Sequence, residues 1–319
     1  MTRVLVTGGG GYIGSHACKR LAECGYEPVT FDNFSTGWRD AVRFGPMIEG
    51  DLLDPTSVAA AFENVRPEAV LHFAALSQVG ESVAQPGRYW RNNVGGTLNL
   101  LEAMRDAAVS PLVFSSTAAT YGEADLDLIP ETASQSPTNP YGQTKLAIER
   151  MIADFGAAHG LRAVVFRYFN VAGADGAASI GERHRPETHL VPLILDAASG
   201  RRDSITVFGT DYPTPDGTCI RDYLHVEDLV DAHILGLSRV LDGGEGAVMN
   251  LGVGHGLSVR EMIDRCRIVT GLDIPEILGS RRAGDPSRLV CDGRRARAEF
   301  DWNPTRSDPD RMIGDAWRW

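Results

Sequence analysis

Three glycines spaced three residues apart, Gly8, Gly11 and Gly14, constrain the fold of this chain more than any other feature. They follow an apolar run at residues 4–7, typical of a buried strand, and lead into a helical pattern at residues 14–23. In such a strand–turn–helix, Gly8 permits the tight turn, Gly11 lets the backbone approach a ligand, and Gly14 lets the helix pack closely on the strand. The helix N-terminus then presents N–H groups and a partial positive charge, which favour a pyrophosphate.

The alternation of strand and helix continues through the first half of the chain. Strands are predicted at residues 4–7, 27–32, 47–49, 69–73, 112–115 and 163–168, and helices at 14–23, 55–63, 93–108 and 141–158. The strand segments are rich in Val, Leu and Phe without polar alternation, as expected for strands buried on both faces of a parallel sheet. Repeated units of this kind predict an α/β fold with a doubly wound, parallel Rossmann-type sheet.

The composition of the sequence changes after about residue 170, where Gly, Pro, His and Arg become frequent and the apolar runs become short. A helix at 226–240 and a strand at 248–251 then resemble the first half again. We therefore predict a cofactor-binding Rossmann domain at residues 1–169, with returns near 226–251. A smaller, mixed α/β substrate-binding lobe is predicted at 170–319.

The bulk composition excludes several classes of protein. The formal net charge of the 319 residues is −11, and an acidic chain is a poor general ligand for nucleic acid or an anionic membrane. No signal-peptide pattern and no apolar run of membrane-spanning length occurs, which predicts a cytoplasmic protein. The five cysteines fit no zinc-ligand spacing, so free thiols and no metal are expected.

An acidic residue, Asp32, ends the second predicted strand. A carboxylate at this point accepts hydrogen bonds from the adenosine ribose and repels a 2′-phosphate, so NAD is favoured over NADP. Asp51, after the third strand, is placed to accept from the adenine amino group.

Tyr141 and Lys145 lie four residues apart at the start of a helical pattern, which places both on one face. A free phenol, with a pKa near 10, is a poor base at neutral pH, but a neighbouring ammonium favours the phenolate. Such a pair removes a hydroxyl proton while a hydride leaves the same carbon. Thr117, at the end of the fifth predicted strand, is the candidate hydroxyl that orients the substrate.

The glycine spacing resembles that of the extended short-chain dehydrogenase/reductase superfamily. Within it, the whole chain resembles the UDP-glucose (UDP-galactose) 4-epimerase family. The segments that carry this resemblance are VTGGGGYIGSH, HFAA, VGES, NNVGGT, FSSTAATYG, NPYGQTK, FRYFNVAGA, HRPETHLVPL, VFGTDYPTPDGTCIRDYLHVEDL and RRAGDP.

The resemblance implies roles for individual residues. Beside the glycines, the positions that match NAD contacts are Tyr12, Ile13, Asp32, Asn33, Asp51, Leu52, Phe73, Ala74, Asn92, Tyr141 and Lys145. Tyr141 matches the catalytic base, Lys145 its partner and Thr117 a position that is Ser or Thr in the family. The positions that match contacts to the UDP-sugar are Thr117, Asn170, His189, Leu190, Phe208, Arg221, Arg282, Asp285 and Leu289. The two arginines also offer planar donor forks suited to a diphosphate.

The chain departs from some family members at three positions. Ser77 stands where some carry a lysine near the nicotinamide, and His189 replaces an amide residue. Leu289 matches the position that limits the size of the sugar, where a large aromatic side chain would exclude N-acetylated sugars.

The expected reaction is the interconversion of UDP-galactose and UDP-glucose by transient oxidation at carbon 4 with tightly bound NAD. A 4,6-dehydratase needs an acid and a base beside the threonine, and here Ala118 and Ala119 follow Thr117. Other UDP-sugar 4-epimerases, for UDP-N-acetylhexosamines or UDP-xylose and UDP-arabinose, remain open as alternatives. A non-catalytic NAD-sensing protein is the remaining one. The apolar residues of the 93–108 and 141–158 helices predict a homodimer through a four-helix contact.

Overall fold

In the computed structural model, residues 1–282 and 285–319 are described, so Ala283 and Gly284 of the RRAGDP segment lie outside the described residues. The chain divides by its internal contacts into two compact units. Unit 1 comprises Met1–Gly122, Gln135–Arg167 and Val230–Met249, and unit 2 comprises Glu123–Ser134, Tyr168–Leu229 and Asn250–Trp319. The assignment of cofactor binding to residues 1–169 and of substrate binding to residues 170–319 remains a prediction.

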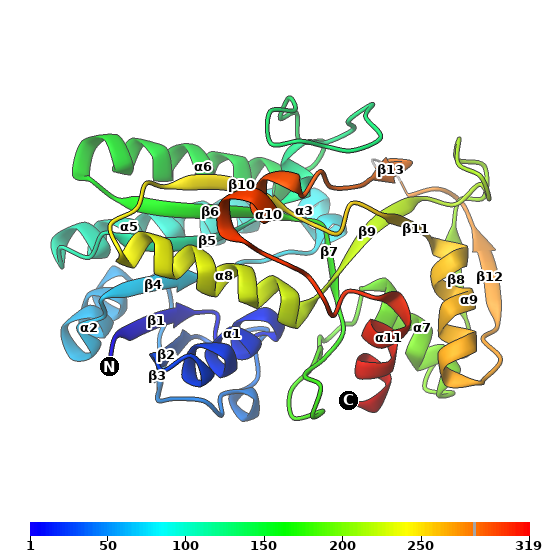
Figure 1. Cartoon of the computed structure of the whole chain (residues 1–319), viewed down its shortest axis with the longest axis horizontal. Coiled ribbons are helices and arrows are strands. Elements are labelled where there is room, and N and C mark those ends of the chain that lie inside the picture. Colours follow the sequence, from blue (N-terminus) through cyan, green and yellow to red (C-terminus); the bar gives the residue numbers. More distant parts are fainter. Residues whose placement is uncertain (283–284) are drawn as a thin grey trace. The chain divides into compact units, whose positions relative to one another are not determined.

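Unit 1 is built on a seven-stranded sheet with the order β10-β6-β5-β4-β1-β2-β3 (Figure 1). The strands are β1 (Arg3–Thr7), β2 (Glu27–Asp32), β3 (Met47–Glu49), β4 (Ala69–His72), β5 (Pro111–Thr117), β6 (Arg162–Tyr168) and β10 (Ala247–Leu251). From β3 through β2, β1 and β4 to β5, neighbouring strands pair in parallel. The chain moves outward from β1 to β3 and then continues on the other side of β1 from β4. This order confirms the predicted doubly wound α/β fold.

Helices cover both faces of this sheet. On one face, α2 (Pro55–Val65), α5 (Gly96–Asp106) and α6 (Pro140–His159) share a core with the strands. That core contains Leu5, Val29, Phe31, Val58, Ala61, Phe62, Val65, Val70, Leu100, Leu101, Met104, Leu112, Phe114, Ile148, Ile152 and Val165. On the other face, Gly236 of α8 (Val226–Leu241) approaches Val164 and Phe166, the neighbours of Val165 in β6. Because successive side chains of a strand point to opposite faces, α8 lies opposite α5 and α6.

The predicted helix at residues 93–108 is divided in the structure. A π-helical segment, Trp90–Gly95, precedes α5, following the short helices α3 (Val79–Ala84) and α4 (Pro86–Tyr89). The buried Asn93 lies in this segment, and its side chain bonds to the backbone N–H and C=O of Leu76, each at 2.9 Å. Periodicity alone did not show this, since a side chain that bonds to a distant loop leaves no helical pattern.

Unit 2 contains a four-stranded sheet, a strand pair and four helices among the described residues. Strand β9 (Ile220–His225) pairs with β7 (Asn170–Ala172), β11 (Gly256–Ser258) and β13 (Arg288–Leu289), and β8 (Ile205–Phe208) pairs with β12 (Glu276–Gly279). The helices are α7 (Leu190–Ala198), α9 (Val259–Thr270), α10 (Arg294–Phe300) and α11 (Pro309–Arg318). Helices α7, α9 and α11 enclose a second core, which includes Val191, Ile194, Tyr223, Met262, Ile263, Cys266, Met312 and Ile313.

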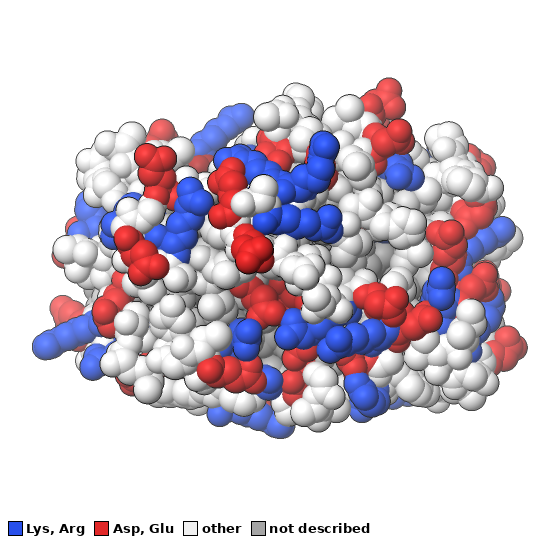
Figure 2. Space-filling view, in the orientation of Figure 1, with Lys and Arg blue, Asp and Glu red and all other residues white. Residues whose placement is uncertain are grey.

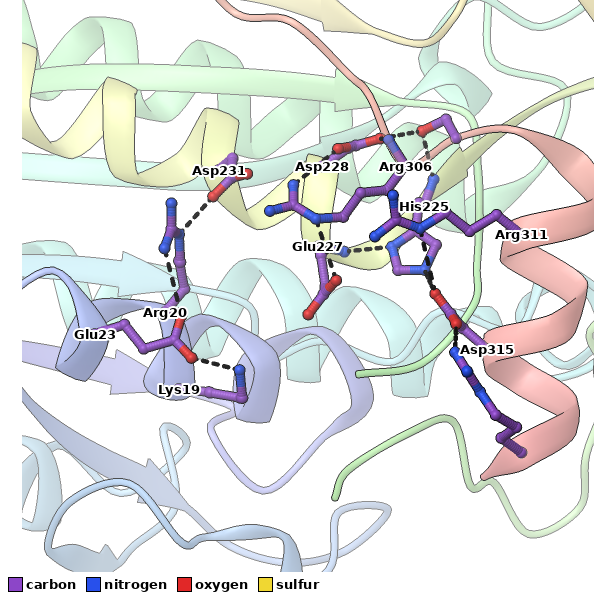
Figure 3. Close-up of polar contacts among 12 residues, drawn as sticks. Lys19, Arg20, Glu23, His225, Glu227, Asp228, Asp231, Arg306, Arg311 and Asp315 are labelled. Carbon is purple, nitrogen blue, oxygen red and sulfur yellow. Dashed lines mark hydrogen bonds and ion pairs between the residues drawn. The ribbon is translucent and has the colours of Figure 1, made fainter. Parts of the chain in front are cut away.

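Buried carboxylates tie the last segment of the chain into unit 2 (Figure 3). Asp228 accepts hydrogen bonds from the backbone N–H of Arg306 at 2.8 Å and from the hydroxyl of Ser307 at 2.6 Å. His225 pairs with Asp315 of α11 at 3.2 Å. In unit 1, Arg20 of α1 (Tyr12–Glu23) bonds to Asp231 of α8 at 2.6 Å, which joins two helices on one face of the sheet.

No helix in the described part of the chain is long and apolar enough to cross a membrane.

On the face drawn in Figure 2, acidic and basic side chains are interspersed. This face therefore lacks the continuous basic field that a nucleic-acid-binding surface uses.

The turn from β1 into α1 depends on two glycines. Gly8 has φ of +78°, and a Cβ on it would lie 2.6 Å from the backbone nitrogen of Ala74. A Cβ on Gly14 would lie 2.1 Å from the carbonyl oxygen of Gly8, so the first turn of the helix sits directly on the strand end. Helix α1 accordingly begins at Tyr12, with Gly11 as its N-cap, two residues before the predicted start.

We expect Gly14→Ala to lower the free energy of unfolding by about 1–3 kcal/mol, because the added methyl group meets backbone atoms that cannot move without displacing β1 or α1. Urea unfolding followed by far-UV circular dichroism measures the change. Gly80→Ala in α3 is the matched control, since nothing lies within 4 Å of a Cβ at that position. Equal stability of the two variants would contradict the proposed role of the close contact.

Candidate active site

The turn after β1 and the end of β2 form one polar cradle. Asp32 is 9% exposed, and its carboxylate accepts the backbone N–H of Gly10 at 2.9 Å and of Phe34 at 2.8 Å. Burial raises the pKa of Asp32 above its usual range, although the two N–H bonds oppose the shift. The carboxylate is thus held beside the glycine turn, where the sequence predicts the adenosine ribose.

The other predicted cofactor residues of this edge lie on neighbouring strand ends. Asn33 donates to the carboxylate of Asp51 at 3.1 Å, which links the segments after β2 and β3. Phe73 and Ala74 follow β4, and their N–H groups donate to the carbonyl of Thr7 at 3.0 and 3.1 Å. The carboxyl ends of parallel strands meet at one edge of a sheet, so these residues share the edge that carries the glycine turn.

Leu52 and Asn92 contact the helices that follow. The carbonyl of Leu52 accepts the side-chain amide of Asn99 in α5 at 2.7 Å. The side-chain amide of Asn92 donates to the side-chain oxygen of Asn93 at 3.0 Å, in the π-helical segment.

The local sequence places Tyr141 in the first turn of α6. Asn139 is the N-cap, and its side chain accepts the backbone N–H of Gly142 at 2.9 Å, while Pro140 occupies the first helical position. A Cβ on Gly142 would lie 2.5 Å from the carbonyl oxygen of Ala119, so the start of α6 packs against the segment that follows Thr117. Tyr141 is therefore half-buried at the end of β5.

Lys145 is buried one turn further along α6. Its ammonium donates to the carbonyl of Ser115 in β5 at 2.7 Å and lies 4.8 Å from the centre of the Phe114 ring. Burial lowers the pKa of Lys145 to about 7, and the charge of Glu149 opposes this shift. Lys145 is four residues after Tyr141 in α6, a spacing at which the charge of the amine acts on the proton affinity of the phenol.

Thr117, the last residue of β5, is 8% exposed. It caps a 3-10 turn, Ala118–Thr120, and its hydroxyl oxygen accepts the backbone N–H of Ala119 at 3.1 Å. That bond uses the oxygen as an acceptor, so the hydroxyl proton remains available to a substrate oxygen.

Sequence reasoning missed a buried ion pair behind the Tyr–Lys pair. Arg167 in β6 donates to Glu149 in α6 through Nη2 at 2.6 Å and Nε at 3.0 Å, and both side chains are 7% exposed. Glu149 also accepts the hydroxyl of Ser116, and Arg167 donates to the hydroxyl of Tyr121 at 2.9 Å. Glu149 lies four residues after Lys145, so helical spacing was the available signal.

A second missed group lies beside Phe73. The buried His233 in α8 is paired with the hydroxyl of Ser115 at 3.1 Å, and its ring lies 5.0 Å from the rings of Phe73 and Phe166. Nothing in the spacing of the sequence relates residue 233 to residue 115.

Three predicted substrate residues share the sheet of unit 2. Arg221 in β9 is the register partner of Leu289 in β13, and its guanidinium pairs with Asp285. Asn170 in β7 pairs with Tyr223, two residues further along β9. One short sheet thus brings together residues that are more than a hundred positions apart.

The remaining predicted substrate residues lie on neighbouring elements of unit 2. The guanidinium of Arg282 stacks over the ring of Phe208, at the end of β8, 4.0 Å from its centre. His189 is the N-cap of α7 and Leu190 its first residue. Partial desolvation opposes the charge of His189, but hydrogen bonds to Glu182 and Glu187 outweigh it and raise its pKa to about 10.

Three features occur together in unit 1. They are a close turn at the helix N-terminus, a carboxylate at the end of β2 and a Tyr–Lys pair beside β5. This combination is typical of oxidoreductase folds that bind a nucleotide cofactor. The chain belongs to the NAD dependent epimerase/dehydratase family, which it matches over residues 4–252.

Individual relatives narrow the comparison. The chain is 52% identical to the UDP-glucose 4-epimerase of Streptomyces lividans, over 99% of this chain and 95% of that protein. The crystal structure of UDP-glucose 4-epimerase from Brucella ovis in complex with NAD superposes with a TM-score of 0.97 at 48% identity, covering 100% of this chain and 98% of that one. The epimerase from Stenotrophomonas maltophila, with bound NAD and formylated UDP-arabinopyranose, has a TM-score of 0.96 at 40% identity, covering 100% and 98% of the two chains.

We predict that Glu149→Gln lowers the free energy of unfolding by about 3–5 kcal/mol, because it leaves Arg167 buried without its counter-charge. Chemical denaturation followed by intrinsic fluorescence measures the loss. Glu23→Gln is the control, since Glu23 pairs with Lys19 and Arg20 at the surface and its side chain is 43% exposed. An exposed pair contributes about 0–1 kcal/mol, so similar losses in both variants would show that the buried pair has no special weight.

Proposed function

We propose that this chain interconverts UDP-galactose and UDP-glucose by reversible oxidation at carbon 4, with NAD held in the cradle of unit 1. The observation that carries the proposal is the pairing of Tyr141 and the buried Lys145 beside a threonine that is followed by two alanines. The 52% identity to a named UDP-glucose 4-epimerase over nearly the whole chain supports the same activity.

The cofactor fits the residues that are present. Gly11 is the N-cap of α1, and a Cβ there would approach only the carbonyl oxygen of Gly8, at 3.2 Å, so the start of the helix is open to a pyrophosphate. Asp32 offers a carboxylate to the ribose hydroxyls. Bound NAD would accept a hydride from carbon 4 and return it.

Tyr141 is the proposed acid and base. In its phenolate form it takes the proton from the 4-hydroxyl while the hydride leaves the same carbon, and it later returns that proton. Lys145 tunes this exchange through its charge, and Thr117 donates a hydrogen bond to the substrate oxygen.

The same residues argue against the other activity of the family. Elimination of water from carbons 5 and 6 requires an acid and a base beside the threonine, and Ala118 and Ala119 carry no ionisable group. The site therefore supports a reaction that returns the cofactor to its original oxidation state and releases no water.

The nucleotide is proposed to be held by Asn170, His189, Leu190, Phe208, Arg221, Arg282, Asp285 and Leu289. Arg221 and Arg282 offer guanidinium groups to the diphosphate, which offsets the acidic net charge of the chain locally. Binding energy that is concentrated on the nucleotide leaves the sugar free to present either face to the cofactor. Leu289 is smaller than an aromatic residue. The assay below therefore compares UDP-sugars with and without an N-acetyl group.

We also propose that the chain is cytoplasmic. All five cysteines are free thiols among the described residues, which fits a reducing compartment.

The test of the function is the conversion of UDP-galactose to UDP-glucose by purified protein with no added cofactor, followed by chromatography. Tyr141→Phe should reduce turnover by about 10²–10⁴-fold, because it removes the group proposed to exchange the 4-hydroxyl proton. Parallel reactions with UDP-N-acetylgalactosamine and UDP-xylose measure the substrate range.

Tyr26→Phe serves as the control for the tyrosine, since Tyr26 lies on the turn between α1 and β2. It should leave turnover unchanged. Accumulation of a 4-keto product, or full activity of Tyr141→Phe, would disprove the proposed mechanism.

A homodimer is proposed through the helices that follow β4. The sequence also predicts a contact through α6, but Ile148 and Ile152 of α6 are buried in the core of the chain itself. Large apolar side chains are exposed there: Val79 and Val83 in α3, Trp90 in the π-helical segment and Leu98 in α5 are 39–63% exposed. Light scattering should give twice the 34.5 kDa mass of one chain. Leu98→Arg should yield monomers, whereas Leu126→Arg, at an exposed apolar residue outside these helices, should not. A monomeric mass for the unaltered protein would refute the dimer.

A further inference from the structure

The segment between β7 and α7 gathers two histidines and two glutamates. Glu182, His184, Glu187 and His189 each offer one ligand atom, and these four atoms all lie within 4.8 Å of one another. The glutamate side chains are largely buried, with exposed fractions of 6% for Glu182 and 14% for Glu187, and the histidines lie toward solvent. All four belong to unit 2, outside the Tyr–Lys site of unit 1.

The separations match those of a metal site. His184 Nδ1 lies 3.3 Å from Glu182 Oε1 and 3.4 Å from Glu187 Oε2, and His189 Nδ1 lies 3.5 Å from Glu187 Oε1. Ligand atoms about 2.0–2.2 Å from a tetrahedral zinc ion are about 3.3–3.6 Å apart. A further contact, between His189 Nδ1 and Glu182 Oε1 at 2.5 Å, is a hydrogen bond whose proton a metal ion would replace.

The glutamates are held by contacts of their own. The backbone N–H groups of Thr188 and His189 donate to Glu187 Oε1 at 2.7 and 2.9 Å. The indole N–H of Trp319 donates to the carbonyl of Glu182 at 3.1 Å, and its ring fills the space beside Gly181. Such outer contacts orient the ligands of metal sites.

The charges and the ligand types of the cluster together select which divalent cation it would bind. Two carboxylates and two imidazoles balance either two protons or one divalent cation. Mg²⁺ is held by oxygen ligands, so the two imidazole nitrogens of the cluster disfavour it. Imidazole nitrogens favour Zn²⁺.

We propose that Glu182, His184, Glu187 and His189 bind one zinc ion. The site would connect the segment after β7 to the first turn of α7 and would fix the position of Leu190. The site shares His189 with the proposed nucleotide contacts, so zinc binding is measured without nucleotide, and its outcome does not depend on whether the chain is an epimerase.

The test is titration of the EDTA-treated, desalted full-length protein with ZnCl₂ by isothermal titration calorimetry. We expect one zinc ion per chain and no comparable binding of MgCl₂. Glu187→Gln should weaken zinc binding at least about tenfold, and the double variant H184N/H189N at least about 100-fold, since each removes ligand atoms. His255→Asn, at an exposed histidine between β10 and β11, should bind zinc as the unaltered protein does.

A second readout separates loss of a ligand from loss of structure. Co²⁺ bound by two nitrogens and two oxygens in tetrahedral geometry gives visible d–d absorption, which should be present in the unaltered protein and in His255→Asn and absent in H184N/H189N. Thermal unfolding identifies any variant that does not fold. The proposal fails if the unaltered protein binds no stoichiometric zinc, or if folded H184N/H189N binds zinc with unchanged affinity.

Discussion

The carbonyl oxygen of Gly8 lies where a side chain on residue 14 would have to be, and much of unit 1 follows from this close approach. It lets α1 begin directly after the turn that follows β1, so that the N-terminus of the helix faces that turn. The turn then brings the N–H of Gly10 onto the carboxylate of Asp32 at the end of β2. The helix end proposed to bind phosphate and the acid proposed to bind ribose are thereby adjacent on one sheet edge.

The burial of the Lys145 amine is the second constraint on the structure of unit 1. Lys145 loses its hydration inside α6 and recovers only a carbonyl, an aromatic face and the more distant charge of Glu149. Glu149 is itself held by Arg167 in β6, and the same carboxylate accepts the hydroxyl of Ser116, next to Thr117. The polar groups behind the candidate catalytic residues therefore form one connected network, which limits how far any of them moves alone.

Local patterns were sufficient for the doubly wound sheet and most of its elements. The strands at 27–32 and 47–49 are those of the structure, and α2, α6 and α8 differ from the predicted helices by at most two residues at either end. These segments are long or strongly apolar, and burial on both faces leaves a signal that needs no partner to be read. The π-helical segment escaped prediction, and the bond between its Asn93 and Leu76 is a contact that no periodicity records.

The residues of the candidate site likewise fall into those that local sequence patterns predict and those that only the folded structure brings together. Gly8, Gly14, Asp32, Tyr141 and Lys145 are predictions from spacing, since the place of each depends on one strand end or one helix turn. The pairing of Arg221 with Leu289, the bond between Ser115 and His233, and the pair Glu149–Arg167 join segments that are far apart in the chain.

The sequence by itself determined the alternation of strands and helices, the glycine turn and the face of α6 that carries the Tyr–Lys pair. Only the tertiary structure decided which distant side chains meet, including the cluster of Glu182, His184, Glu187 and His189, whose spacing matches no common metal motif. The reason is that periodicity and turn chemistry act over a few residues. The neighbours of a buried charge, by contrast, are chosen by the packing of whole elements in a medium where an unpaired ion is costly.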